Sequence, residues 1–130
     1  MGAKENAEVV RRGYEAFQKG DMAAFDDILA DDCVWHVPGK SQVAGDKKGR
    51  KATVDYYVQL GTLTDGNISV ELHDVIANDE HVAGLHRTSA SRGGNSFETT
   101  EVIVFHVQNG KITEAWEHPF DLYGQDKVYA

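Results

Sequence analysis

The sequence predicts an α+β fold in which helices pack on one face of a curved antiparallel sheet. Apolar residues recur at three- and four-residue steps in the first half of the chain, as amphipathic helices require. The second half changes to an alternation of apolar and polar residues, which indicates strands. Turn-forming pairs such as Asn109-Gly110 separate these strands, as tight hairpins require. A sheet curled around helices forms a cone with an open mouth, where we expect a ligand pocket.

The order of the elements follows from these patterns and from the Gly, Pro and Asp residues that end them. Three helices are expected, at 4–19, 22–29 and 52–60. A first strand is closed by Pro38-Gly39, and four more follow the third helix; the expected strands are 33–37, 68–73, 81–90, 97–108 and 111–118. Residues 1–130 therefore predict one domain.

Composition excludes several classes of function. Thirteen Lys and Arg against twenty-one Asp and Glu give a net charge of −8, which repels nucleic acid. No apolar run approaches the roughly 20 residues that span a bilayer, and the N-terminus lacks a signal peptide, so no membrane partner is expected. Cys33 is the only cysteine, which favours a reducing cytoplasm.

Two segments, 9–21 and 29–39, resemble the opening of SnoaL-like proteins, which belong to the nuclear transport factor 2-like superfamily. The likeness covers nearly the whole chain, because it continues at Gly45, Gly49-Arg50, Asn109-Gly110-Lys111-Ile112, Trp116 and Asp121. This resemblance implies a cone-shaped α+β barrel with three N-terminal helices. The superfamily includes isomerases, cyclases, hydrolases and members without known chemistry, so it implies the fold more strongly than an activity.

The resemblance also predicts what the protein does not do. Ketosteroid isomerases of this superfamily need a Tyr on the first helix and two Asp in the pocket. An alignment without gaps puts Gly13, Val37 and Val102 at those positions. Because neither Gly nor Val can donate or move a proton, this alignment predicts that the protein is not a true ketosteroid isomerase.

Asp121 is the first candidate for a catalytic residue. SnoaL-like cyclases, by resemblance, use an Asp near the end of the final strand as acid and base in an aldol closure, and Asp121 matches that position. Removing a proton next to a carbonyl needs a carboxylate whose pKa is raised in a dry pocket. The alternative is that Asp121 is solvated and caps the C-terminal segment.

Strand parity supplies two assisting candidates. His106 shares a strand face with Val102 and Val104, which the alignment turns inward. Glu117 shares its parity with Asp121, but a bulge at Pro119 would turn His118 inward instead. Parity and bulk give the remaining predicted ligand-binding residues: Phe17, Trp35, Val37, Tyr57, Leu85, Arg87, Val104 and His118.

These residues predict a cofactor-independent acid/base enzyme of cyclase, isomerase or hydrolase type, acting on a small apolar cyclic or polyketide-like substrate. No zinc or calcium spacing is present, so no metal is expected. A non-catalytic module that binds a small molecule in the same pocket is the alternative, and an interaction protein is the third hypothesis. Trp116, His118 and Phe120 form a stripe on the other side of the last strand, which predicts a homodimer through the sheet face.

Overall fold

The computed structural model describes residues 2–130 and shows helices packed on a six-stranded mixed sheet that does not close into a full barrel. The strand order is β2-β1-β6-β5-β4-β3. All neighbouring strands are antiparallel except β1 and β6, which run parallel. The strands are β1 (Leu29–Val37), β2 (Gly45–Lys48), β3 (Ile68–Ala77), β4 (His81–Arg92), β5 (Asn95–Gln108) and β6 (Lys111–Pro119).

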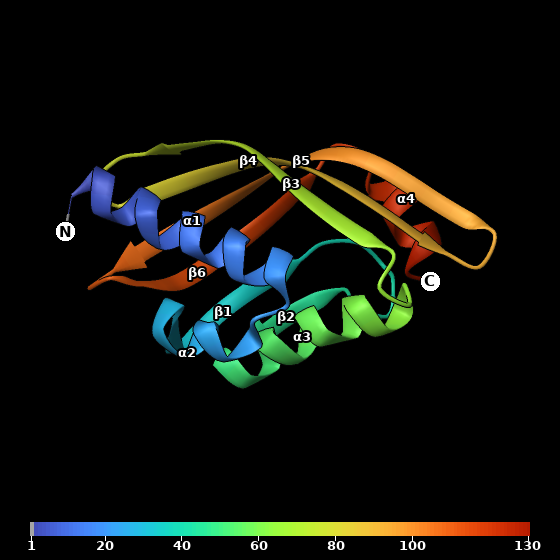
Figure 1. Ribbon diagram of the computed structural model, residues 1–130, viewed down its shortest axis with the longest axis horizontal. Coiled ribbons are helices and arrows are strands. Elements are labelled where there is room, and N and C mark those ends of the chain that lie inside the picture. The colour runs from blue at the N-terminus through green and yellow to red at the C-terminus, as the bar shows by residue number, and fades with distance from the viewer. Residues whose placement is uncertain (1) are drawn as a thin grey trace.

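The helices lie in the concavity of this sheet and at its end (Figure 1). Helix α1 packs mainly against β3 and β4, α3 packs against β1 and β2, and α4 packs against β5 and β4. A single turn of 3₁₀ helix, η1, leads directly into α2. The helical elements are α1 (Ala3–Lys19), η1 (Met22–Ala24), α2 (Phe25–Ile28), α3 (Arg50–Leu63) and α4 (Leu122–Val128). No helix among residues 2–130 is long and apolar enough to cross a membrane.

The predicted α+β class and the cone-like arrangement are confirmed, with three corrections to the elements. The second helix is shorter than predicted, because β1 begins at Leu29. Strand β2 was not predicted, since its sequence Gly-Asp-Lys-Lys has no apolar residue and backbone pairing with β1 alone defines it. Helix α4 was not predicted either, because Gly124 interrupts its short run.

The sheet is mixed rather than wholly antiparallel. Parallel pairing of Trp35 with Ala115 and His36 with Trp116 places the first and last strands side by side. The alternation of apolar and polar residues indicates a strand, but it does not show whether the adjacent strand runs parallel or antiparallel. It therefore could not reveal this pairing. The last strand also keeps an unbroken register with β5 from Ala115 to Pro119, so Pro119 causes no bulge.

Candidate active site

A cavity of about 80 Å³ lies between α1, α3 and the inner face of the sheet. Eight aromatic side chains line it: Tyr14, Phe17, Phe25, Trp35, Tyr56, Tyr57, Phe105 and Tyr129. Its acidic groups are the side chains of Glu101 from β5 and Glu117 from β6. Within the described chain, no Lys or Arg side chain lines this cavity.

The Glu117 carboxyl is held by two donors. Its Oε2 accepts a hydrogen bond from Trp35 Nε1 at 2.6 Å and another from the Tyr56 hydroxyl at 2.8 Å. All three side chains are buried. Trp35 is placed by the inward alternation of β1, and Tyr56 by the inner face of α3. Because donors to a buried carboxylate stabilise its charged form, these contacts orient one oxygen of Glu117 and partly offset the cost of its burial.

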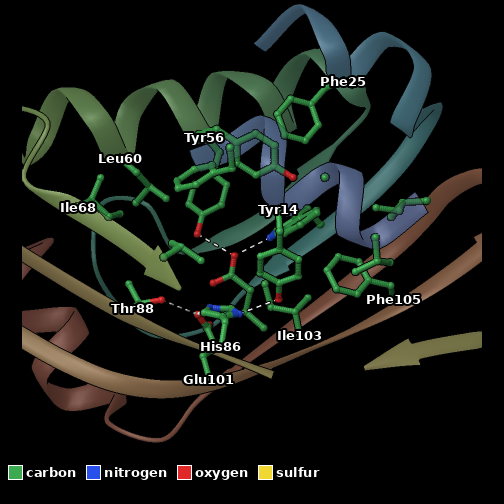
Figure 2. A pocket seen from close by; sticks show the side chains of 18 of the residues that line it. Tyr14, Phe25, Tyr56, Leu60, Ile68, His86, Thr88, Glu101, Ile103 and Phe105 are labelled. Carbon is green, nitrogen blue, oxygen red and sulfur yellow. Dashed lines mark hydrogen bonds and ion pairs between the residues drawn. The ribbon is translucent and has the colours of Figure 1, made fainter. Parts of the chain in front are cut away.

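Glu101 is the second buried carboxyl group, and it faces a histidine. Its Oε1 lies 2.8 Å from His86 Nε2 and accepts a longer hydrogen bond of 3.5 Å from the Thr88 hydroxyl. Its Oε2 is buried without a hydrogen-bond partner among the described residues. Figure 2 shows Glu101, His86 and Thr88 together at the polar end of the cavity.

The two carboxyl groups form a coupled pair that keeps protons unusually well. Burial raises the pKa of Glu101 to about 7. Burial, reinforced by repulsion from Glu101, raises the pKa of Glu117 to about 8. Because the charge of Glu101 disfavours the charge of Glu117 in the same cavity, the two groups do not ionise together easily near neutral pH. The cavity therefore contains an acid and a base of the same chemical type.

His86 is neutral and connects this pair to a tyrosine. Burial lowers the pKa of His86 to about 4, so its 2.8 Å contact with Glu101 is a hydrogen bond between a neutral imidazole and a carboxyl. The other ring nitrogen, Nδ1, lies 2.7 Å from the hydroxyl of Tyr14, on α1. Burial raises the pKa of Tyr14 strongly, which keeps this phenol protonated. In Figure 2 the hydroxyl of Tyr14 points toward His86.

Some of the predicted site residues line this cavity. Glu117 does so together with Phe17, Trp35 and Tyr57, which supply a carboxyl and three aromatic walls. Val37 is buried in the hydrophobic core but does not line the cavity. Parity and bulk could place these side chains because the strands and helices that carry them have one clearly apolar face.

Other predicted residues lie on the opposite face of the sheet, which corrects the predicted register of β4 and β5. Ile103 and Phe105 line the cavity, so the alternate residues of β5 point outward. The same alternation turns Gly84 and His86 inward on β4. The residues that face outward are Leu85, Arg87, Val104, His106 and His118. Arg87 pairs there with Glu98, and His106 contacts Thr113. Both faces of β5 carry apolar residues, so alternation did not distinguish them.

Asp121 does not line the cavity. It is the N-cap of α4, where its side chain accepts a hydrogen bond from the Gly124 amide at 2.9 Å. Its own amide donates to the Thr99 hydroxyl. The structure therefore gives Asp121 the capping arrangement that was the alternative to a catalytic one.

Two of the three positions that were used to exclude ketosteroid isomerase chemistry lie next to a polar side chain that faces the cavity. Gly13 lines the cavity without a functional group, but its neighbour Tyr14 brings a hydroxyl there. Val102 faces outward, and Glu101, one residue earlier, brings a carboxyl inward. Each of these two aligned positions was one residue away from the functional side chain.

Sequence reasoning missed Tyr14, His86 and Glu101. The three- and four-residue apolar steps of the helix predicted at 4–19 include Tyr14 as one apolar residue, although a buried Tyr usually needs a hydrogen-bond partner. His86 and Glu101 are cross-strand partners in the register of β4 and β5. Two polar residues directly opposite each other on a buried sheet face were the available signal. Among residues 2–130, no group of three or more His, Cys, Asp or Glu is arranged to hold a metal ion.

Comparisons with known proteins agree with this fold. The chain is 33% identical over 124 residues to an uncharacterized protein of Mycobacterium tuberculosis, covering 95% of each. The structure of Bal32a, from a soil-derived mobile gene cassette, matches with a TM-score of 0.95 and 40% identity over 98% of each chain. An NTF2-like protein of Burkholderia xenovorans LB400 matches with a TM-score of 0.84 and 21% identity over 100% of this chain and 99% of its own. A model of the SnoaL-like domain matches residues 10–115, and the chain therefore belongs to the SnoaL-like family.

Proposed function

We propose that this protein is a cofactor-independent acid/base enzyme that moves a proton next to the carbonyl group of a small apolar compound. The carboxyl pair of Glu101 and Glu117 carries this proposal, because both groups line an aromatic cavity and burial there raises the pKa of each. A buried carboxylate whose pKa is raised is a stronger base than a solvated one, and a positioned general base contributes about 10² to 10⁴ in rate. Enolisation is the step common to the isomerase and aldol-cyclase chemistry of such sites.

Glu117 is the proposed base. Trp35 and Tyr56 both donate to its Oε2, which fixes the carboxyl plane within the aromatic wall. A base held in one orientation loses little freedom when the substrate reacts. Tyr14 is a proton donor at the same end of the cavity, because burial raises its pKa, and Glu101 is the donor when Glu117 is the ionised member of the pair.

The cavity volume limits the substrate. At about 80 Å³ it is smaller than the roughly 150 Å³ cavity that binds benzene in an engineered lysozyme. A ketone or aldehyde of a few heavy atoms fits this volume. A cyclic or polyketide-like substrate requires the aromatic side chains that line the cavity to move apart.

Exchange of hydrogen for deuterium next to the carbonyl of acetone tests this function. The rate is followed by proton NMR in deuterated buffer near neutral pH, with wild-type protein, Glu117→Gln and the control Glu8→Gln, whose side chain is exposed on α1. We expect the wild type and the control to accelerate exchange equally. We expect the exchange rate with Glu117→Gln to be about 10²-fold lower. Equal rates in wild type and Glu117→Gln would contradict the proposal. Binding of acetone without exchange would favour the alternative, a non-catalytic binding module.

We further propose that the protein forms a homodimer through the outer face of the sheet. Trp116, Val102, Val104 and Leu85 form a half-buried apolar area there. Apolar patches of this kind usually mark interfaces. Sedimentation of the wild type and of Val104→Lys at micromolar concentration tests this, with a dimer expected only for the wild type; a monomeric wild type would contradict it.

A further inference from the structure

A continuous chain of short contacts joins Tyr14 to Glu101 around one end of the cavity. The Tyr14 hydroxyl lies 2.7 Å from His86 Nδ1, and His86 Nε2 lies 2.8 Å from Glu101 Oε1. Glu117 lines the same cavity, and repulsion from Glu101 contributes to its raised pKa. Tyr14, His86, Glu101 and Glu117 are all buried, so bulk water does not compete for these hydrogen bonds.

A neutral imidazole has one donor and one acceptor, so the direction of every hydrogen bond in this chain is coupled. In the first arrangement, Glu101 is ionised, His86 Nε2–H donates to it, and the Tyr14 hydroxyl donates to Nδ1. In the second, protonated Glu101 donates to Nε2, and Nδ1–H donates to the Tyr14 oxygen. Only the second arrangement leaves the Tyr14 O–H free to donate to a ligand.

We infer that Tyr14, His86 and Glu101 form a proton circuit, in which the tautomer of His86 couples the protonation of Glu101 to the donor direction of the Tyr14 hydroxyl. This inference rests on the proposed function, because the circuit gives a substrate oxygen its proton while Glu117 removes the proton from carbon. Glu117 and Tyr14 are the catalytic residues here. His86 is a positioning residue that acts through Tyr14.

The transfer is balanced within the cavity. The substrate Cα–H bond breaks and its proton forms an O–H bond on the Glu117 carboxylate, while the electron pair moves through the new carbon–carbon double bond to the carbonyl oxygen. That oxygen takes the proton of Tyr14. Tyr14 takes the proton of His86 Nδ1, and His86 Nε2 takes the proton of Glu101. The result is a neutral enol and the first arrangement, so the pair holds one proton before and after the step.

A step without net charge transfer suits this site, because no Lys or Arg among residues 2–130 lines the cavity to stabilise a free enolate. The other groups that face the pair stay neutral through this cycle. Tyr56 from α3 and Tyr129 after α4 both have a pKa raised by burial, as does Tyr57 beside Glu117. Trp35 has no titratable proton in this range. The circuit is thus the route by which protons move between Tyr14, His86 and Glu101.

Nitrogen NMR of His86 tests the coupling without a substrate. The protonated and unprotonated ring nitrogens resonate far apart, so ¹⁵N-labelled histidine reports the tautomer directly. Between about pH 6 and pH 9, where the carboxyl pair titrates, we expect the proton to move from Nδ1 to Nε2 while the ring stays neutral. In Glu101→Gln we expect one tautomer throughout. A single tautomer in the wild type across this range, or formation of imidazolium, would overturn the inference.

The acetone exchange reaction then separates this inference from the proposed function. His86→Gln keeps a donor and an acceptor between Tyr14 and Glu101 but cannot pass a proton from one atom to the other. We expect the kcat of His86→Gln to fall by about 10²-fold with KM unchanged. When the wild-type rate is plotted against the deuterium fraction of the solvent, we expect a curve, because several protons move in one step. For His86→Gln we expect a straight line. Full activity in His86→Gln, with Glu117→Gln inactive, would refute the circuit and leave the proposed function standing. If the His86 tautomer changes with pH in the wild type but the wild type does not accelerate acetone exchange, the coupling is supported and the proposed function is refuted.

Discussion

The ring of Tyr14 packs directly over the backbone of Gly84, and a Cβ atom at residue 84 would lie 2.5 Å from the Tyr14 hydroxyl oxygen. Gly84 faces the cavity from β4, two residues before His86. The missing side chain at Gly84 is therefore what allows the hydroxyl of Tyr14 to reach Nδ1 of His86. A glycine in a strand interior often marks such a close approach.

Gly84→Ala should displace Tyr14 and destabilise the protein. Overpacking of this kind costs about 1 to 3 kcal/mol in the free energy of unfolding, measured by urea denaturation. Gly61→Ala is the matched control, because nothing lies within 4 Å of its added methyl and it sits inside α3. There, Ala should stabilise the helix by about 0.5 to 1 kcal/mol. Loss of stability in both variants, or in neither, would contradict the packing described for Gly84.

Stability should fall as the pH rises through the titration of the carboxyl pair. The folded pKa values of Glu101 and Glu117, about 7 and about 8, lie above the ordinary value of 4.5, so the folded state binds protons more tightly than the unfolded state. This stabilisation is present at low pH and is lost as pH rises through the folded values.

Urea unfolding between pH 6.5 and 8.5 measures this loss. The range lies above the ordinary His pKa of 6.5, so His86, whose folded pKa is lowered, no longer changes the free energy of unfolding with pH. We expect the wild type to lose about 3 kcal/mol over this range and Glu117→Gln to lose about 1 kcal/mol. A wild-type profile as flat as that of Glu117→Gln would show that the pair titrates normally.

Trp35 should report the ionisation of Glu117 through its fluorescence. Its indole N–H donates to Glu117 at 2.6 Å, whereas Trp116 stacks on His36 at the outer face of the sheet. In a Trp116→Phe background, the emission of Trp35 should change with a midpoint above pH 7, because the pKa of Glu117 is raised to about 8.

Tyr56→Phe in the same background should move that midpoint to higher pH. The Tyr56 hydroxyl stabilises the Glu117 carboxylate, so its removal raises the pKa of this group further. A midpoint that falls or does not move would mean that Tyr56 does not donate to the ionised form.

Asp121→Ala should affect stability and leave proton transfer intact. Loss of an N-cap side chain costs about 1 kcal/mol, and Asp121→Asn, which keeps the cap, should cost much less. Both variants should exchange acetone within about twofold of the wild type. A large loss of exchange in Asp121→Asn with unchanged stability would return Asp121 to the catalytic role that the family resemblance implies.

The sequence predicted the class of fold because long segments follow a single period, as in 4–19 and 97–108. It predicted Glu117 because this residue shares its strand parity with Asp121, and β6 does turn Glu117 into the cavity. It placed Val104 and His106 on the wrong side, since β5 is apolar on both faces and a shift of one residue reverses every side chain. Glu101 and His86 could not be found together because their proximity depends on the register of β4 with β5.

The parallel pairing of β1 with β6 has a consequence for how the protein is made. The cavity wall requires residues 29–37 and 111–119 to meet, so most of the chain must leave the ribosome before the sheet can be completed. Until then β1 and β2 form a two-stranded ribbon, which is marginally stable alone. Contacts between such distant segments slow folding and expose apolar surface during synthesis. We therefore expect nascent chains that end before β6 to depend on chaperones, although the finished domain is small.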